Sequence, residues 1–364
     1  MPKSSPWPLA SHAIIRSSAE LAGTAFDALE FRQRADLPGA ADLPFAVSRP
    51  LLYRAQPDPA DPLVRQFFPT AAERQTWPAE SPDPLSERLH GIMPRLIHQY
   101  PNRVLIRVNG ECAAYCRFCY RRGLLHERRG WLSPTEASDI GRYLAARRGA
   151  IKEVLLSGGD PLFASDHRLA ELLQLLRRSL PEAVLRLCTR LPVALPERIT
   201  ASLTALLQAA APLVLVLHCN HPSELSADVK AGLTRLRLAG VPLVGQSVLL
   251  RGVNDRAETL EQLCNDLLAC GVQPYYLFQG DLAAGTAHFR VALSRGLALY
   301  AELRRRLSGL ALPRYAVDAP DGKGKMYLPE DIVGLDETGW HLRNAFGAEA
   351  RYPEEVEAAG WPDA

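Results

Sequence analysis

Short apolar runs alternate with longer amphipathic stretches along most of this chain, from about residue 103 to about residue 312. The apolar runs are rich in valine and leucine, and they begin near Val104, Val154, Val184, Leu213, Leu243 and Pro274. The first two starts are 50 residues apart, and the later ones follow at intervals of about 30 residues. The stretches between the later runs repeat their apolar residues at helical spacing, at 167–180, 197–210, 226–239 and 257–270. This alternation predicts βα units in a parallel sheet that is buried on both faces.

Six such units are too few for a closed eight-stranded barrel. We therefore predict an α/β fold with a partial (β/α)6 barrel over residues 103–312. Residues 1–102 are rich in proline and poor in strand pattern, so we expect a largely helical extension with a helix at 17–34. Residues 313–364 form a C-terminal segment. In folds of this kind ligands bind at the carboxyl ends of the strands, and functional residues are expected there.

Composition and charge narrow the possible classes. The 364 residues are 47% hydrophobic and 23% charged, an ordinary globular composition that excludes wholesale disorder and a disulfide miniprotein. With 42 basic and 40 acidic residues, the net charge of +2 does not indicate nucleic acid binding. The apolar runs are too short to span a bilayer, and the first residues lack the apolar core of a secretory signal. An odd cysteine count also suits a reducing compartment, so we expect a cytoplasmic protein.

Three of the seven cysteines stand together directly after the first predicted strand. Cys112, Cys116 and Cys119 have the spacing C-x3-C-x2-C. A zinc ion normally has four protein ligands, and so does an iron–sulfur cube. Three thiolates without a nearby fourth ligand therefore indicate a [4Fe-4S] cluster in which one iron is open to another ligand. A zinc site completed by a distant residue, or chance spacing, is the alternative.

The second predicted strand ends in Ser157, Gly158, Gly159 and Asp160. Glycines at a strand end allow the backbone to approach a ligand closely, and an aspartate accepts hydrogen bonds from an ammonium group. Taken alone, such a glycine pair is more often only a turn between a strand and a helix. Together with the cysteines, it resembles the radical SAM superfamily. The resemblance implies that S-adenosylmethionine (SAM) chelates the open iron and that this second motif contacts its amino group.

Further segments narrow the resemblance to one family. They are HQYPNRVLIRV at 98–108, CRFCYRR at 116–122, LLSGGDPL at 155–162, HCNHPSEL at 218–225, GQSVLLRGVND at 245–255, PYYLFQGDLAAGTAHF at 274–289 and YAVDAPDGKGK at 315–325. All are similar to segments of the lysine 2,3-aminomutase family, in the same order, over about residues 44–329. The resemblance implies an enzyme that uses SAM and pyridoxal 5′-phosphate to exchange an amino group with a hydrogen on the neighbouring carbon.

Pyridoxal phosphate requires a lysine for its Schiff base, and the chain has only five: Lys3, Lys152, Lys230, Lys323 and Lys325. The family pattern DAP-x4-K aligns Lys325 with the Schiff-base lysine, in what we interpret as a glycine-rich loop. Lys323 and Asp321 replace two glycines of that pattern, so Lys323 is either a surface charge or a phosphate contact. The resemblance also implies that Arg103 holds the cofactor phosphate, although Gln99 replaces a second arginine of the family.

An amino acid substrate has a carboxylate, for which arginine is a suitable bidentate partner, whereas a distal cation requires buried carboxylates. Arg121 matches the family residue that binds the substrate carboxylate, and Asp281 and Asp318 match the pair that binds the side-chain ammonium of lysine. Taken singly, each aspartate could instead be a cap or turn residue. His218 and Gln246 match family residues near SAM, although each could be an ordinary polar residue at a strand end.

One departure concerns a structural zinc site of the clostridial-type enzyme, which uses cysteines in a C-terminal extension and one after the VND segment. Here Arg256 follows VND, and no cysteine occurs after Cys270. We therefore expect that zinc site to be absent and the chain to belong to a compact branch of the family.

The resemblance thus implies conversion of L-α-lysine to β-lysine by a 1,2-amino migration that a 5′-deoxyadenosyl radical initiates. One alternative is an aminomutase for another basic amino acid, arginine or ornithine. Another is a non-catalytic iron–sulfur protein on a degenerate scaffold. Besides the amino acid substrate, the expected partners are an electron donor such as flavodoxin or ferredoxin and further copies of the chain in a homo-oligomer.

Overall fold

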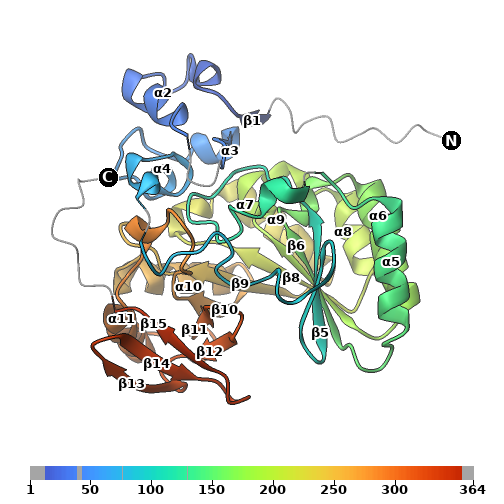
Figure 1. Ribbon diagram of the computed structural model, residues 1–364. Helices are drawn as coiled ribbons and strands as arrows, with labels where there is room; N and C mark the ends of the chain where they lie inside the picture. The colour runs from blue at the N-terminus through green and yellow to red at the C-terminus, as the bar shows by residue number, and fades with distance from the viewer. Residues whose placement is uncertain (1–12, 39–42, 76, 129, 355–364) are drawn as a thin grey trace.

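One open sheet of ten strands forms the centre of the computed structural model, which describes residues 13–38, 43–75, 77–128 and 130–354. The strand order is β12-β11-β10-β9-β8-β7-β6-β5-β4-β3 (Figure 1). Strands β5 to β11 pair in parallel, whereas β3, β4 and β12 pair antiparallel at the two ends of the sheet. The two ends do not pair with each other, so the sheet is a partial barrel rather than a closed one.

The elements of the barrel follow the predicted alternation. Its strands are β3 (Gly91–Met93), β4 (Leu96–Tyr100), β5 (Arg103–Asn109), β6 (Glu153–Gly158), β7 (Val184–Thr189), β8 (Leu213–His218), β9 (Leu243–Val248), β10 (Gln273–Phe278), β11 (Arg314–Ala319) and β12 (Gly324–Tyr327). Its helices are η4 (Leu125–Arg128), α5 (Pro134–Ala145), η5 (Pro161–Phe163), α6 (Asp166–Ser179), α7 (Leu191–Ala194), η6 (Pro196–Arg198), α8 (Ala201–Ala209), η7 (Pro222–Glu224), α9 (Ala227–Leu238), α10 (Ala257–Ala269), η8 (Ala287–Phe289) and α11 (Leu293–Arg306).

All six predicted strands are confirmed as β5 to β10, and the four predicted helices as α6, α8, α9 and α10. Along these strands the residues alternate in burial, because one face packs against the helices and the other lines the inside of the barrel. On β7, for example, Leu185 and Leu187 are buried, whereas Arg186 and Cys188 are only half-buried. The inner face is therefore less apolar than the near-continuous hydrophobic runs predicted.

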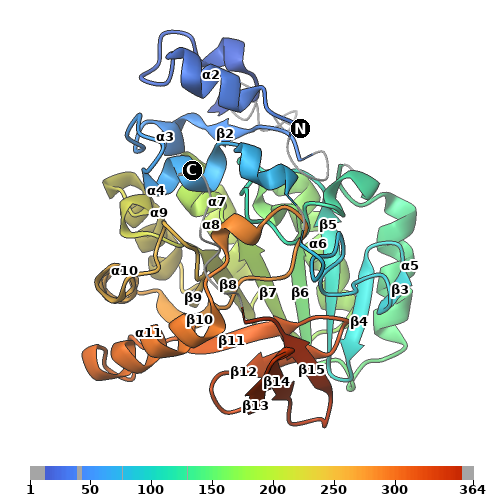
Figure 2. The same ribbon diagram turned by 60° about the vertical axis from the view of Figure 1, so that its left-hand side comes forward.

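The structure adds a seventh parallel strand, β11, which pairs with β10 and continues into the antiparallel strand β12. A separate sheet of β13 (Ile332–Asp336), β14 (Gly339–Arg343) and β15 (Glu349–Tyr352) follows, and Figures 1 and 2 both place it beside β11 and β12. The predicted C-terminal segment thus contributes directly to the barrel, because β11 lies within it.

The N-terminal region contains β1 (Ile14–Ile15), η1 (Ser18–Leu21), α2 (Leu29–Ala35), β2 (Val47–Ser48), α3 (Arg49–Leu52), α4 (Pro62–Phe67) and η3 (Ala71–Arg74). The prediction of one helix at 17–34 was wrong, because a turn separates η1 from α2. Gly23 has φ +73° and donates its backbone N–H to Asp27 Oδ2 over 2.9 Å, while Thr24 Oγ1 accepts from the Phe26 N–H over 3.1 Å. These local side-chain bonds replace helical hydrogen bonds.

An aromatic cluster holds this N-terminal region together. The Phe68 ring lies 5.4 Å from the Phe26 ring, 5.6 Å from Phe31 and 5.1 Å from Phe45, measured between centroids. All four rings are buried, and aromatic pairs at such distances are favourable beyond the area they bury. Figures 1 and 2 place α2, α3 and α4 at one end of the barrel, next to α7, which follows the carboxyl end of β7. The N-terminal region thus covers the end of the barrel where function is expected.

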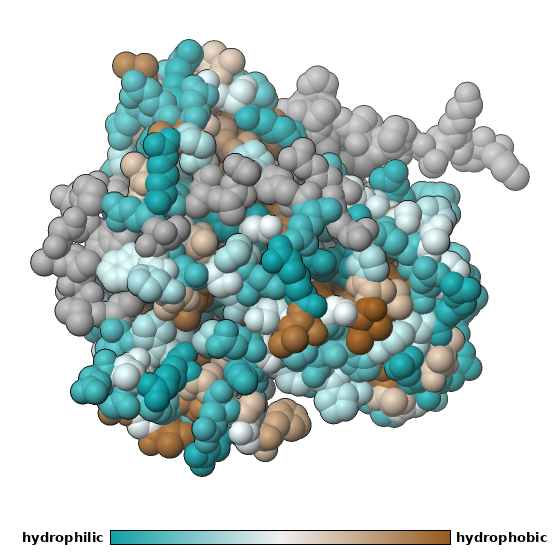
Figure 3. Space-filling model, in the orientation of Figure 1, coloured by the Kyte–Doolittle hydropathy of each residue, from teal (hydrophilic) through white to brown (hydrophobic). Residues whose placement is uncertain are grey.

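The surface in Figure 3 is largely hydrophilic, with apolar side chains in small separate groups. The large hydrophobic residues that are exposed come from distant parts of the chain: Leu29, Tyr53, Trp77, Leu89, Ile92, Leu238, Leu310, Val333, Leu335 and Phe346. Among the described residues, none of the helices combines the length and the apolar character that crossing a membrane requires.

Replacing Phe68 by alanine tests the aromatic cluster. We expect Phe68→Ala to lower the free energy of unfolding by about 3–5 kcal/mol, because it removes the ring that contacts the other three. Urea unfolding followed by circular dichroism measures this loss. Phe346, which is 75% exposed, provides the matched control, and Phe346→Ala should change the stability by less than about 0.5 kcal/mol. Equal effects of the two substitutions would contradict the proposed role of the cluster.

Candidate active site

The carboxyl ends of the parallel strands bring most of the predicted functional residues to one end of the barrel. The cysteine loop follows β5, the segment from Ser157 to Asp160 ends β6, His218 ends β8 and Asp281 follows β10. Gln246 lies beside His218 in the register of β8 and β9, and beside Tyr276 in that of β9 and β10. This arrangement agrees with the general position of sites in parallel sheets.

The three cysteines of the loop lie close enough to affect one another. Burial raises the pKa of all three thiols, and the neighbouring sulfurs raise those of Cys112 and Cys119 further, the latter to about 11. Phe118 stands between the second and third cysteine, with its ring stacked 5.7 Å from His218 and edge-on 6.0 Å from Phe289. These ring contacts fix the loop against β8 and η8.

His218 lies in an apolar position beside this loop. Its Nε2 is buried without a hydrogen-bond partner, and burial, together with the nearby guanidinium of Arg190, lowers its pKa well below the ordinary value. The imidazole is therefore neutral at physiological pH, with one polar atom left for a ligand.

A buried carboxylate ties the cysteine loop to the N-terminal region. Glu73 accepts hydrogen bonds from Arg117 Nε over 2.9 Å, from Arg117 Nη2 over 2.7 Å and from Arg122 Nη2. The three side chains are at most 1% exposed. Burial alone would raise the pKa of Glu73, but the two guanidinium groups hold it below its ordinary value. Two backbone hydrogen bonds also join the loop to the N-terminal region, from the Tyr115 N–H to the Ala46 carbonyl oxygen and from the Arg117 N–H to the Gln66 carbonyl oxygen.

The two glycines after β6 are required by close packing against this loop. Gly158 has φ +111°, and a Cβ there would collide with the Asn109 carbonyl oxygen. A Cβ at Gly159 would lie 2.5 Å from the Glu111 carbonyl oxygen. Any side chain at either position would push the cysteine loop away from β6. The two glycines are therefore needed for the close packing of the cysteine loop against β6, in addition to the ligand contact that the resemblance implies.

The carboxylate of Asp160 is already occupied by donors of the protein. Its Oδ1 accepts from the Leu162 N–H and from Thr189 Oγ1, over 3.0 and 2.7 Å, and its Oδ2 accepts from the Arg190 N–H over 2.9 Å. These bonds join the end of β6 to the end of β7. A contact from Asp160 to an ammonium group, which the sequence predicted, would share oxygens that already hold this junction.

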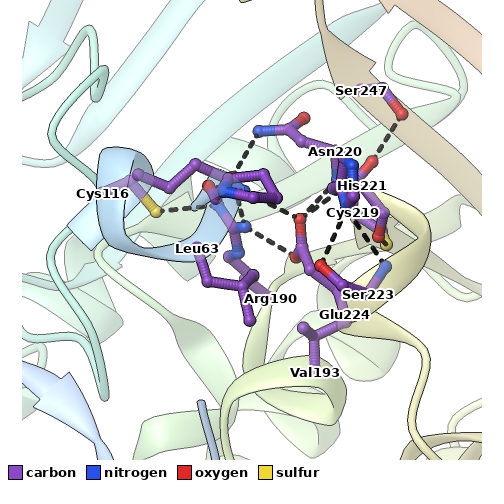
Figure 4. Close-up of polar contacts among 12 residues, drawn as sticks. Leu63, Cys116, Arg190, Val193, Cys219, Asn220, His221, Ser223, Glu224 and Ser247 are labelled. Carbon is purple, nitrogen blue, oxygen red and sulfur yellow. Dashed lines mark hydrogen bonds and ion pairs between the residues drawn. The ribbon is translucent and has the colours of Figure 1, made fainter. Parts of the chain in front are cut away.

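Arg190 is a site residue that sequence reasoning missed. Its Nη1 donates to Cys116 Sγ over 3.1 Å, and its Nη2 donates to Gln66 Oε1 over 2.7 Å and to Glu224 Oε2 over 2.6 Å (Figure 4). Glu224 in turn accepts from the backbone N–H groups of Asn220 and His221. The sequence offered one signal that could have identified Arg190. It is a charged residue directly after β7, and residues at the carboxyl ends of barrel strands commonly face the site.

Arg121 is buried and also has a protein partner. Its Nε and Nη2 both approach Glu87 Oε1, at 2.8 and 2.7 Å, and its Nη1 donates to Ser157 Oγ over 2.7 Å. Glu87 occupies the edge of the guanidinium that contains Nε. One N–H on each terminal nitrogen therefore remains for a second carboxylate. Sequence reasoning missed Glu87, because it lies in the N-terminal region, about 30 residues before its partner.

Lys325, Asp318 and Asp281 form an electrostatic cluster within the site. Lys325 Nζ donates to Asp318 Oδ1 over 2.7 Å and lies 4.0 Å from the centre of the Phe278 ring. Burial and the charge of Asp318 raise the pKa of Asp281 to about 8, against the opposing charges of Lys325 and Arg121. The four side chains that the sequence assigned to lysine chemistry, including Arg121, are thus near one another.

Lys325 belongs to strand β12 and not to a loop, so this detail of the prediction was wrong. The turn before it is completed by Asp321 and Gly322, with φ +58° and +67°, which allows the chain to reverse within four residues. Lys323 is exposed, in agreement with a surface charge. Lys152 directly precedes β6, Lys230 is on α9, and Lys3 lies outside the described residues.

Polar groups surround the turn near Lys325. The Lys325 N–H donates to Tyr100 Oη over 2.8 Å, and the guanidinium of Arg103 lies 3.9 Å from the centre of the Tyr100 ring. Gln99 Nε2 donates to the Gly322 carbonyl oxygen over 2.9 Å. The residue that replaces a family arginine therefore braces the turn.

Comparison with known proteins decides the family. The sequence model of the Radical SAM superfamily matches residues 106–265 of this chain. An L-lysine 2,3-aminomutase of Clostridium subterminale is 38% identical over 82% of this chain and 72% of its own length, and one of Escherichia coli is 39% identical over 71% and 75%. A Treponema pallidum protein with the same name, given provisionally, is 45% identical over 82% and 84%. The chain belongs to the lysine 2,3-aminomutase family of radical SAM proteins.

A solved structure also matches part of the chain. A radical SAM methyltransferase of Sphaerobacter thermophilus matches 61% of this chain and 68% of its own, with a TM-score of 0.44 and 18% identity.

Membership in the family implies a [4Fe-4S] cluster and SAM, and the cysteine loop fits this cluster. The three cysteines follow the carboxyl end of β5, and their thiols are close enough for the charge of one to shift the pKa of another. Among the described residues, no group of three His, Cys, Asp or Glu side chains is close enough to hold a single metal ion. Thiolates that bind separate irons of a cube need not converge on one point.

Replacing Glu73 tests the link between the N-terminal region and the cysteine loop. We expect Glu73→Gln to lower the free energy of unfolding by about 3–5 kcal/mol, because it removes the charge of the buried carboxylate that pairs with both Arg117 and Arg122. Urea unfolding measures the loss, and iron content after anaerobic reconstitution should fall with it. Glu258 pairs with Arg306 at an exposed position, so Glu258→Gln is the control and should have little effect. Unchanged stability in Glu73→Gln would contradict this account.

The raised pKa of Asp281 predicts a dependence of stability on pH. The folded protein holds this proton up to about pH 8, whereas the unfolded chain releases it near the ordinary value of 3.8. Stability should therefore fall as the pH rises between these values. Asp281→Asn removes the titration, so its stability relative to the wild type should increase by up to about 1.4 kcal/mol per pH unit. Urea unfolding from pH 5 to pH 8 checks this slope, and a difference independent of pH would contradict it.

Proposed function

We propose that the protein is a lysine 2,3-aminomutase, which moves the α-amino group of L-lysine to the β-carbon. The observation that carries this proposal is the position of the Lys325 ammonium, 2.7 Å from Asp318 Oδ1 and within the electrostatic range of Asp281. The site already binds the ammonium group of one lysine side chain. When Lys325 binds a cofactor through its nitrogen, Asp318 would become available for the ammonium of a substrate, and the charge of that ammonium would favour release of the proton that Asp281 holds.

The opposite end of the substrate would meet Arg121. The guanidinium has one N–H on each terminal nitrogen that is not directed to Glu87 or Ser157. This pair of donors matches the geometry of a carboxylate. A basic amino acid bound between Arg121 and the two aspartates would have both of its charged ends neutralised, and its α- and β-carbons would lie between them. Such fixed positioning supplies much of the catalytic effect in reactions of bound substrates.

The proposed cofactors are a [4Fe-4S] cluster on Cys112, Cys116 and Cys119, SAM and pyridoxal phosphate. When bound, the cluster and SAM would supply a 5′-deoxyadenosyl radical for removing a substrate hydrogen, with one electron from a donor such as flavodoxin or ferredoxin, and pyridoxal phosphate would supply a conjugated ring that can delocalise an unpaired electron. Lys325 would hold the pyridoxal phosphate covalently, and Arg103 would neutralise its phosphate.

The glycines of the turn before Lys325 let it pack closely against other side chains. A Cβ at Gly322 would lie 2.6 Å from His90 Nε2, and a Cβ at Gly324 would lie 2.9 Å from Tyr100 Oη. This packing holds Tyr100 against the turn, and the guanidinium of Arg103 lies over the Tyr100 ring, so that a cation is near the turn. These contacts support a phosphate site, although Gln99 takes the place of one family arginine.

An anaerobic assay with SAM, pyridoxal phosphate and dithionite tests the proposal. We expect β-lysine from L-lysine, and a kcat/KM for lysine at least tenfold above those for ornithine and arginine. Chromatography of the products after derivatisation measures this and separates the enantiomers. Higher kcat/KM with ornithine or arginine would assign the enzyme to that substrate. Absence of any β-amino acid from a protein with four irons would favour the non-catalytic iron–sulfur alternative.

Replacing Asp318 tests the ammonium site. We expect Asp318→Asn to lower kcat/KM for lysine by about 100-fold, which corresponds to about 2.7 kcal/mol for losing one partner of a partly buried charge pair. Asp336 lies on the separate β13–β15 sheet and provides the control, since Asp336→Asn should leave kcat/KM unchanged. Equal rates in Asp318→Asn and the wild type would remove Asp318 from the substrate site.

Replacing Lys325 tests the cofactor site separately. Pyridoxal phosphate bound covalently to the wild type should be fixed by borohydride reduction and found by mass spectrometry on the peptide that contains Lys325. Lys325→Ala should lose this label, whereas Lys323→Ala should keep it, because Lys323 is exposed and outside the strand. A label on Lys323, or an undiminished label in Lys325→Ala, would reassign the cofactor lysine.

A further inference from the structure

We propose that Arg190 sets the reduction potential of the cluster, as a positioning residue that acts through Cys116. The guanidinium donates a charge-assisted hydrogen bond from Nη1 to Cys116 Sγ over 3.1 Å. The other two cysteines have different surroundings: besides burial, the pKa values of Cys112 and Cys119 respond to neighbouring sulfurs and backbone groups, and that of Cys119 also to the charges of Arg121 and Arg122. The inference concerns the cluster alone and does not depend on which amino acid is the substrate.

Arg190 is held in this position from several sides. Its backbone N–H donates to Asp160 Oδ2, and its Nη2 is fixed by Glu224 Oε2 and Gln66 Oε1 (Figure 4). The side chain is 9% exposed and Glu224 is 0% exposed. The guanidinium also lies 4.7 Å from the centre of the Phe67 ring. Because every one of these contacts comes from the folded core, the donor cannot rotate away from Cys116 without breaking buried hydrogen bonds.

Each partner of Arg190 is itself fixed. Glu224 Oε1 accepts from the N–H groups of Asn220 and His221 and from Gln66 Nε2. Asn220 Nδ2 donates to Gln66 Oε1 over 3.0 Å. The network thus joins α4, the end of β7 and the turn after β8 to the second cysteine. Glu224 alone would be enough to compensate the charge of Arg190. The additional contacts orient the guanidinium so that its Nη1 group donates to Cys116 Sγ.

The direction of the effect follows from electrostatics. Reduction of a cluster by one electron adds a negative charge, part of which lies on the cysteine sulfurs. A hydrogen bond from a cationic donor to such a sulfur stabilises the reduced form more than the oxidised form and raises the potential. The low polarity of the surroundings strengthens this difference. Arg190 should therefore make the cluster easier to reduce by a weak biological electron donor.

The test is a redox titration of the reconstituted protein without SAM, followed by electron paramagnetic resonance. We expect Arg190→Gln to make the one-electron reduction of the cluster about tenfold less favourable, a shift of 59 mV to lower potential. Arg190→Lys keeps the charge without the forked donor set and should show a smaller shift in the same direction. Arg177 on α6 donates to backbone carbonyls such as Ala183 O and Ala210 O, so Arg177→Gln is the control and should leave the potential unchanged.

The proposal would be overturned if the equilibrium constant for one-electron reduction of Arg190→Gln, at full iron content, lay within a factor of two of the wild-type value. A second measurement decides the question if Arg190→Gln fails to hold four irons. In wild-type protein made with ¹⁵N-arginine, pulsed resonance of the reduced cluster should show a ¹⁵N coupling that is absent from Arg190→Lys. Identical couplings in the two proteins would also overturn it. Both measurements use the cluster alone, so loss of aminomutase activity does not affect their interpretation.

Discussion

The buried carboxylate of Glu73 is the interaction on which the arrangement of the site depends. It neutralises Arg117 and Arg122, which flank the last cysteine of the loop, in a region from which water is excluded. Two acids further along the same segment repeat the pattern, since Glu80 pairs with Arg290 and Glu87 with Arg121. Three carboxylates of the N-terminal region thus compensate four arginines of the barrel. The region and the barrel therefore form one electrostatic unit, because either part alone would leave buried charges unpaired.

The same principle explains how an almost neutral chain can have a strongly charged interior. Arg190 is compensated by Glu224, and Lys325 by Asp318, while Asp281 has no ion pair among the described residues and its pKa is raised by burial. The pairs of Glu73 with Arg117 and of Glu224 with Arg190 belong to the framework that holds the cysteine loop. Under the proposed function, Asp281, the remaining donors of Arg121 and Nε2 of His218 would be the groups that face a ligand.

The sequence predicted the barrel well, because apolar runs such as the one from Leu213 and the amphipathic stretches between them reflect local physical constraints. It also predicted that the cysteine loop and the segment from Ser157 to Asp160 follow strands of the barrel. It did not predict the turn at Gly23, where local hydrogen bonds from Thr24 and Asp27 compete with a helix, or the inclusion of Lys325 in a strand. Glu73, Glu87, Gln66 and Glu224 escaped notice because their roles arise from partners distant in sequence, and no local pattern marks a pairing of that kind.

The pairing of β11 with β12 has a consequence for how this chain can change over time. Asp318 and Lys325 are directly opposite each other in that hairpin, on the same face of the sheet. Side chains of a strand alternate between the two faces, so adding or removing one residue between positions 319 and 324 would turn Lys325 toward the opposite face. Substitutions in the turn, such as those that introduced Asp321 and Lys323 at family glycine positions, leave this parity intact. The turn can therefore vary in composition over generations while its length stays fixed.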